Sequence, residues 1–271
     1  MTVTNAQRAL TDAIHRVLAQ DDDVEAAWLA GSLGAGRGDA FSDVDVLVLA
    51  AHGKVGDVAS RHARNVAAIA APALVMPLYG GRVLSVVTVD WQRFDLTFIE
   101  ADDLVRYDPG QLANLFDRTM RVLPARPAAV YQTPPPQLLK LVNEFLRVLG
   151  LSVVAMGREE YLLGLRGVDL LRQMTIEVML EENDIGPLER GGALHLNPML
   201  TAAQRGELAT LAPVAASRDG VLGASMALAA MFLPRAARLG ARVGMHWPEA
   251  FEQATRRHLQ TNLGVVLGGT D

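Results

Sequence analysis

The chain has 271 residues, of which 50% are hydrophobic and 20% charged, the balance of an ordinary globular protein rather than a disordered or fibrous one. Its net charge of −5 argues against a nucleic-acid scaffold, because such proteins usually present a basic face. Without cysteine, neither a disulfide framework nor a thiolate metal site can form. The first residues lack a signal-peptide core and the apolar runs are too short to span a bilayer, so we expect a soluble, cytoplasmic protein.

The first half of the chain alternates between helical and extended patterns. Apolar positions at helical spacing predict helices over residues 5–19 and 55–70. Short apolar runs bounded by turn residues predict strands over residues 24–30, 43–50, 73–79, 83–89 and 93–100. These elements predict an N-terminal domain on a mixed β-sheet over residues 1–123.

Prolines gather over residues 124–136 and end in a run of three. Because such a run cannot continue a helix or lie in a central strand, we interpret this stretch as a linker. Beyond it, helical periodicity predicts helices over residues 137–156, 158–182, 201–212, 222–241 and 248–262. The expected fold class is α+β, with an all-helical C-terminal bundle over residues 137–271.

A glycine-rich segment follows the first predicted strand and leads into an acidic pair. Gly31 and Ser32 end the strand, and the backbone N–H groups of the segment can close on phosphate oxygens. Asp43 and Asp45 open the next strand, where alternate side chains share a face about 6–7 Å apart. That separation suits two carboxylates that bracket a pair of Mg²⁺ ions about 3.5–4 Å apart.

A further acid interrupts a strand that otherwise resembles a core strand. Phe94, Leu96 and Phe98 share one apolar face, so Asp95 points to the other face. A lone buried carboxylate is unfavourable unless it is paired or bound to metal. If this strand lies beside the one that carries Asp45, three carboxylates cluster and need a cation to remain ionised together.

The Gly-Ser pair, the Asp-x-Asp pair and the later acidic strand residue resemble the signature of polymerase-β-type nucleotidyltransferases. The longer pattern, with Gly36, Gly38-Asp39 and Ser42-Asp43, is similar to antibiotic nucleotidyltransferases of the lincosamide and aminoglycoside type. The segment from Met156 to Tyr161 also looks like a helix start of that group. The resemblance implies a nucleotidyltransferase domain, Mg²⁺ in a two-ion site, and transfer of a nucleoside monophosphate, AMP from ATP, to a hydroxyl of a small molecule. Proteins of this kind often form dimers, so a homodimer is a possible assembly. From the net charge and the length of the apolar runs, we expect neither nucleic acid nor a membrane as a partner.

Residue by residue, the resemblance makes Asp43, Asp45 and Asp95 the metal ligands and catalytic acids, with Asp95 as the base. It places Gly31 and Ser32 on the nucleotide phosphates. Further candidate nucleotide contacts are Arg37, Ser42 and Lys140. Relatives often carry glutamate where Asp95 stands and a basic residue where Ala35 stands, and Arg37 is a candidate to compensate for the latter. For Lys140, the alternative is a solvated helix face.

Two other functions stay open at this point. A protein-adenylylating antitoxin would use the same acids on a protein acceptor, although such antitoxins usually lack a large helical half. A non-catalytic nucleotide-sensing protein would keep the fold, but a decayed site is expected to lose at least one acid. The identity of the acceptor and the choice between ATP and GTP are also open. Elsewhere, residues 21–23 are expected to form a loop, and His62 is expected to face solvent.

Overall fold

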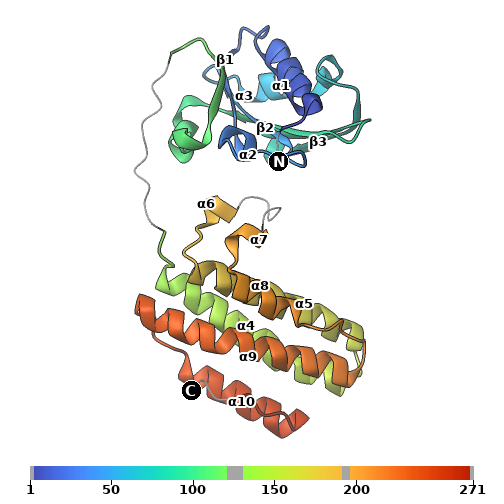
Figure 1. Ribbon diagram of the computed structural model, residues 1–271, viewed down its shortest axis with the longest axis vertical. Coiled ribbons are helices and arrows are strands. Elements are labelled where there is room, and N and C mark those ends of the chain that lie inside the picture. The colour runs from blue at the N-terminus through green and yellow to red at the C-terminus, as the bar shows by residue number, and fades with distance from the viewer. Residues whose placement is uncertain (1–2, 121–130, 191–195, 269–271) are drawn as a thin grey trace. The chain divides into compact units, whose positions relative to one another are not determined.

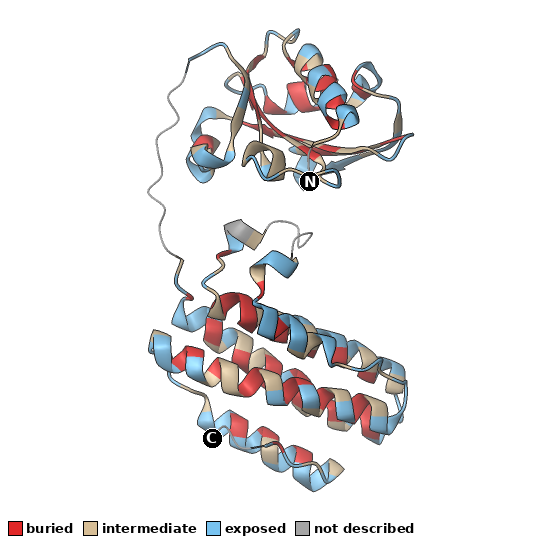
Figure 2. Ribbon diagram, in the orientation of Figure 1, coloured by how far each residue is buried: buried red, intermediate tan, exposed pale blue. Residues whose placement is uncertain are grey.

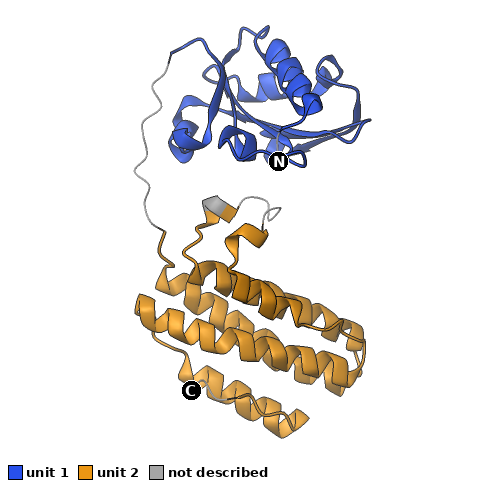
Figure 3. Ribbon diagram, viewed as in Figure 1, with its two compact units in different colours: residues 1–128 blue, residues 129–271 orange. Residues whose placement is uncertain are grey.

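The computed structural model describes residues 3–120, 131–190 and 196–268 (Figure 1). The chain divides into two compact units, residues 1–128 and residues 129–271 (Figure 3). Unit 1 is built on a mixed β-sheet and unit 2 is helical, so the expected α+β fold class is confirmed. Most of the predicted linker, residues 124–130, lies outside the described residues.

Unit 1 contains a six-stranded sheet in the order β3-β4-β5-β2-β1-β6. Its strands are β1 (Val24–Leu29), β2 (Val44–Ala50), β3 (Pro72–Leu78), β4 (Val83–Thr88), β5 (Arg93–Ile99) and β6 (Ala113–Asp117). Strands β2 and β5 pair in parallel, and every other neighbouring pair is antiparallel. Strand β6 was not predicted from the sequence. It has only five residues and none of them is fully buried, so no apolar pattern marks the strand.

Helices α1 (Asn5–Leu18) and α3 (Val55–Arg64) cover one face of the sheet (Figure 1). The apolar stripe of α1 and the buried side of α3 pack on alternate residues of the central strands. This core includes Leu10, Ile14, Leu18, Val58, Val44, Val46, Val48, Phe94, Leu96 and Phe98. Both central strands therefore turn their intervening side chains to the opposite face.

The opposite face is only partly covered. The 3-10 helix η3 (Ala101–Arg106) contributes Leu104 to a small second core, together with Leu47 and Leu49 near the end of β2. The beginnings of β2 and β5, on the same face, carry half-buried polar side chains instead, and Figure 2 shows where burial changes along the strands. We call this face of the sheet the open face.

His62 does not face solvent, so that prediction is wrong. The ring is 4% exposed and its Nε2 lies 3.0 Å from a carboxylate oxygen of Asp21. Arg61 donates two hydrogen bonds to the same carboxylate and one to Asp23. Helical periodicity predicts the helix. It does not predict that an aspartate about forty residues away in the sequence pairs with the histidine of this helix and that the histidine faces inward.

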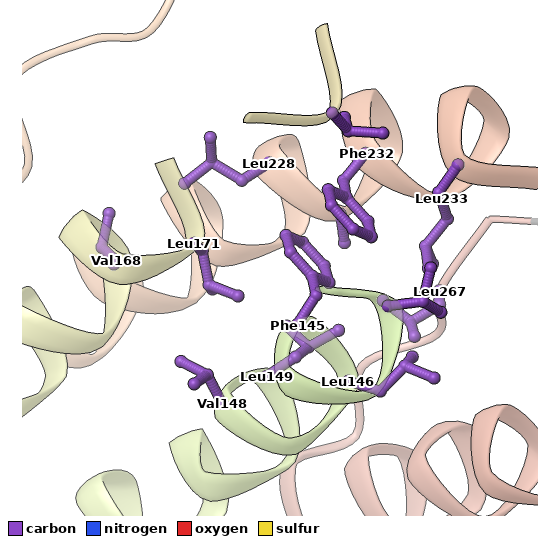
Figure 4. Packing of buried hydrophobic residues seen from close by; sticks show 14 of the residues in the cluster. Phe145, Leu146, Val148, Leu149, Val168, Leu171, Leu228, Phe232, Leu233 and Leu267 are labelled. Atoms are coloured by element: carbon purple, nitrogen blue, oxygen red, sulfur yellow. The ribbon is translucent and has the colours of Figure 1, made fainter. Parts of the chain in front are cut away.

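The described residues of unit 2 form four long helices and three short ones. They are α4 (Pro135–Gly157), α5 (Tyr161–Glu182), α6 (Pro187–Arg190), α7 (Leu196–Met199), α8 (Ala202–Ala209), α9 (Arg218–Val243) and α10 (Glu249–Leu263). In the core the rings of Phe145 and Phe232 stack with centroids 3.8 Å apart, and leucine and valine side chains surround them (Figure 4). Helix α4 starts two residues before its predicted start, because proline is tolerated in the first turn, where its missing N–H has no helical partner.

Helix α9 is long and apolar enough, by length and composition, to cross a membrane, so the expectation that every apolar run is too short for this is wrong. In unit 2 its side chains Leu228, Phe232, Leu233 and Leu239 belong to the bundle core. Packing against α4 and α5 therefore accounts for its apolar composition.

Candidate active site

The parallel pairing of β2 with β5 brings the predicted acids together on the open face. Asp45 and Asp95 are register partners on these two strands, and Asp43 lies two residues before Asp45. Their neighbours Val44, Val46, Phe94 and Leu96 are buried in the core below, so each acid is turned the other way by the alternation of its strand. Local apolar patterning thus orients the carboxylates, and strand pairing sets them side by side.

The electrostatics of the cluster show in the pKa of Asp45. Burial, together with the negative charges of Asp43 and Asp95, raises the pKa of this carboxyl from 3.8 to about 6. The nearby Arg93 guanidinium acts in the opposite direction. Near neutral pH the site therefore holds carboxylates whose joint ionisation is unfavourable without additional positive charge.

The turn after β1 closes tightly over Asp45. The Ala30 N–H donates to the Asp45 carbonyl at 2.9 Å, and Gly31 follows with φ +57°, in the left-handed region. A Cβ atom at Gly31 would lie 2.0 Å from Oδ2 of Asp45. Only glycine fits there, so the backbone of the turn and the carboxylate share one small volume. Ser32 follows, half-buried, in the single-turn helix α2 (Gly31–Gly34).

Ser42 is engaged within its own loop. Its hydroxyl accepts a hydrogen bond from the Asp39 N–H at 3.0 Å and donates to the Asp39 carboxylate at 3.1 Å. Gln7, which the sequence analysis missed, donates from Nε2 to the carbonyls of Asp39 and Ser42 at 2.8 and 2.7 Å. The signal for Gln7 was the capping box that it forms with Thr4. These contacts anchor the loop before Asp43 to α1, and the nucleotide role of Ser42 stays a prediction.

The two predicted basic contacts, Arg37 and Lys140, belong to different units. Arg37 is exposed and donates from Nη2 to the side chain of Gln111 at 3.0 Å. Lys140 belongs to α4 in unit 2, where it lines a cavity of about 240 Å³ together with Glu144 and Glu177. Both nucleotide-binding roles stay predictions.

Arg93 is a site residue that the sequence analysis did not single out. It lies two residues before Asp95 on the same face of β5, and its Nη1 is 3.7 Å from a carboxylate oxygen of Asp43. Its Nη2 also donates to the Phe41 carbonyl at 3.3 Å. The two-residue spacing from Asp95 was the available signal. Arg93 supplies positive charge that partly offsets the repulsion among the acids.

Arg93→Gln is expected to raise the pKa of Asp45 above its value of about 6, because the substitution removes the positive charge that lowers it. Carbon-detected NMR titration of the aspartate carboxyls in metal-free protein measures the change. Arg82→Gln is the matched control, since Arg82 directly precedes β4 but contacts Asp103 at 3.1 Å. An unchanged titration of Asp45 in Arg93→Gln contradicts the role assigned to Arg93.

The donor set of the cluster fits a hard cation. Carboxylate oxygens are the ligands that Mg²⁺ prefers, usually in pairs and completed by substrate phosphates and water. Burial and the neighbouring negative charges raise the pKa of Asp45, so a bound cation would favour its ionised form. Within the described residues, no three acidic or histidine side chains converge into a ready-made metal site. A cation bound by these acids would complete its shell with ligands from outside this cluster.

Comparisons with known proteins give fold likenesses at low similarity. No protein-family model matches the sequence, and the comparison with curated proteins finds no match. Among solved structures, the chain is similar to an aminoglycoside 6-adenyltransferase from Bacillus subtilis, with 13% identity, 94% of this chain and 98% of that chain covered, and a TM-score of 0.43. It is also similar to the CdnC:HORMA-deltaN complex of E. coli MS115-1, with 14% identity, coverage of 97% and 90%, and a TM-score of 0.29. TM-scores this low carry no argument about what the chain does.

Proposed function

We propose that the protein is a metal-dependent nucleotidyltransferase that moves a nucleoside monophosphate, AMP from ATP, to a hydroxyl of a small acceptor. The observation that carries the proposal is the register pairing of Asp45 with Asp95 beside Asp43, under a glycine turn that admits no side chain. Three acids on one uncovered sheet face next to such a turn suit phosphoryl-group transfer with metal ions. The sequence pattern of these residues supports the same chemistry.

Each residue has a defined part in this reaction. Asp43 and Asp45 would hold Mg²⁺, which supplies charge neutralisation of the phosphates and a lower pKa of the acceptor hydroxyl. The backbone N–H groups at Gly31 and Ser32 bind phosphate oxygens of the donor. Asp95 takes the proton of the acceptor hydroxyl as its oxygen bonds to the α-phosphorus and the bond to pyrophosphate breaks.

The acceptor is proposed to be an antibiotic-like molecule, and the resemblance of residues 31–48 to antibiotic nucleotidyltransferases supports this. A protein acceptor uses the same acids and is the main alternative. A nucleotide sensor without catalysis is the second alternative, and the presence of all three acids speaks against it. The homodimer and the cytoplasmic location stay predictions.

Pyrophosphate release from Mg²⁺-ATP is expected in the presence of a suitable hydroxylated acceptor and is expected to vanish in Asp43→Asn, because that substitution removes a proposed metal ligand. The assay uses a panel of lincosamides, aminoglycosides and other hydroxylated small molecules. Asp57→Asn is the matched control, since this aspartate on α3 is 70% exposed and contacts Lys54. Metal-dependent ATP binding without release across the panel moves the proposal to a protein acceptor. Failure to bind Mg²⁺-ATP contradicts the nucleotidyltransferase function.

A further inference from the structure

Strands β3 and β4 extend the open face directly from the acids to the edge of the sheet. Strand register puts Met76 opposite Ser85, and Ser85 opposite Asp95. Asp95 in turn is opposite Asp45. One continuous row of side chains thus runs from the free edge strand to the acidic cluster.

A second row lies beside the first on the same face. It runs from Leu74 on β3 to Val87 on β4 and then to Arg93 on β5. Leu74 is 48% exposed and Met76 is 43% exposed, whereas Val86, on the other side of the sheet, is buried in the core. We call Leu74, Met76, Ser85 and Val87 the β3–β4 strip. It is an apolar surface with one hydroxyl, next to Asp95.

The strip and the Gly31 turn lie on opposite sides of the acids within the sheet. Gly31 follows β1, on the β1 side of β2, while β5 separates the acids from β4 and β3. A donor whose phosphates lie on the Gly31 turn therefore occupies the β1 side of Asp45. Asp95 is the acid nearest to the strip. It lies on the β4 side of the cluster, which the donor phosphates do not occupy.

The charge of the strip selects the kind of molecule that fits there. Residues 72–88, all of them described, contain no aspartate or glutamate, and their one charged residue is Arg82, which is bonded to Asp103. The adjoining charged residue in the second row is Arg93, a cation. The strip itself offers no carboxylate to a polycationic ligand, and the nearest one is Asp95 at the end of the first row. An apolar group, by contrast, gains from covering the half-exposed leucine and methionine side chains.

We propose that the β3–β4 strip binds the acceptor and selects one with an apolar face beside its reacting hydroxyl, in preference to a polycation. This inference rests on the proposed function, because it assigns the acceptor side of the same site. The apolar part of the acceptor lies on Leu74, Met76 and Val87, and its hydroxyl is presented to Asp95. Leu74 and Met76 are specificity-determining residues that take no part in the chemistry.

The test compares binding of two probes by calorimetry in the presence of Mg²⁺ and a non-hydrolysable ATP analogue. Lincomycin carries an apolar alkyl-substituted ring and one amine, and kanamycin is a polycation. Wild type is expected to bind lincomycin more tightly than kanamycin. The double variant Leu74→Gln/Met76→Gln is expected to lose about tenfold in lincomycin affinity, the scale of two half-buried apolar contacts. Its affinity for the nucleotide analogue is expected to stay unchanged.

Leu162→Gln is the matched control, because Leu162 is an equally replaceable leucine, 73% exposed on α5. It is expected to leave lincomycin binding unchanged. The strip is overturned as the acceptor site if wild type binds kanamycin more tightly than lincomycin or does not bind lincomycin at all. It is also overturned if the double variant and wild type bind lincomycin with equal affinity. If wild type does not bind the nucleotide analogue, the proposed function is overturned as well. This result distinguishes failure of the proposed function from failure of the strip as acceptor site.

Discussion

Asp45→Asn is expected to abolish nucleotidyl transfer while making the metal-free protein more stable above pH 6. Activity should fall by roughly 10³-fold or more, the scale of losing several kcal/mol of metal-assisted charge stabilisation in the transition state. Stability should rise because burial and two neighbouring acids disfavour the ionised form of Asp45, and asparagine keeps the shape of the side chain without that charge. Pyrophosphate release and urea unfolding in the presence of a chelator measure the two effects.

The pH dependence of this gain follows from the pKa of Asp45. The folded value of about 6 lies above the ordinary value of 3.8, so between these values the folded protein binds more protons than the unfolded chain. The free energy of unfolding therefore falls as the pH rises from about 4 through 6. The variant lacks this fall, so its advantage should be near zero below pH 4. It should reach on the order of 1–2 kcal/mol at pH 8, after allowance for solvent screening.

Asp57→Asn is again the matched control, because it removes an exposed charge on α3 and is expected to change neither activity nor stability appreciably. Added Mg²⁺-ATP should narrow the stability difference at pH 8, since bound ligand stabilises wild type by mass action. If wild type and Asp45→Asn are equally stable at pH 8 without metal, the charge of Asp45 does not destabilise the folded protein. This result contradicts the proposed repulsion among the three acids.

Gly31→Ala is expected to destabilise the protein and to damage the site at the same time. Its added Cβ would lie 2.0 Å from Oδ2 of Asp45, and φ is +57°, which alanine rarely adopts. The backbone strain and the displaced carboxylate together should cost on the order of 2–3 kcal/mol of unfolding free energy. Because Asp45 must move, affinity for Mg²⁺-ATP should fall by about tenfold or more, as it does when the groups that orient metal ligands are lost. Urea unfolding and calorimetry measure these changes.

Gly36→Ala separates the backbone effect from the contact with Asp45. Gly36 has φ +70°, also in the left-handed region, but a Cβ there would have nothing within 4 Å. It should cost about 1 kcal/mol from strain alone and leave Mg²⁺-ATP affinity unchanged. If the two variants weaken Mg²⁺-ATP binding equally, the close approach of Gly31 to Asp45 is not what shapes the site.

The orientation of the acids could be predicted from the sequence. Val44 and Val46 flank Asp45, and Phe94 and Leu96 flank Asp95, so alternation along each strand assigns every acid to the face opposite the core. Helical periodicity in the same way locates α1 and α3 and the long helices of unit 2. These features are local, because apolar residues that recur every two or about every 3.6 positions can be recognised within a single strand or helix.

Only the tertiary structure decided which residues meet across the sheet. The parallel register that sets Asp45 beside Asp95 depends on a partner strand about fifty residues away, and shifting it by one residue would turn one strand's side chains to the wrong face. Three further contacts also join separate elements of the fold. They are those of Arg93 with Asp43, of the Gly31 turn with Asp45, and of His62 with Asp21. Such contacts follow from how whole faces pack, and no spacing within a single strand or helix encodes them.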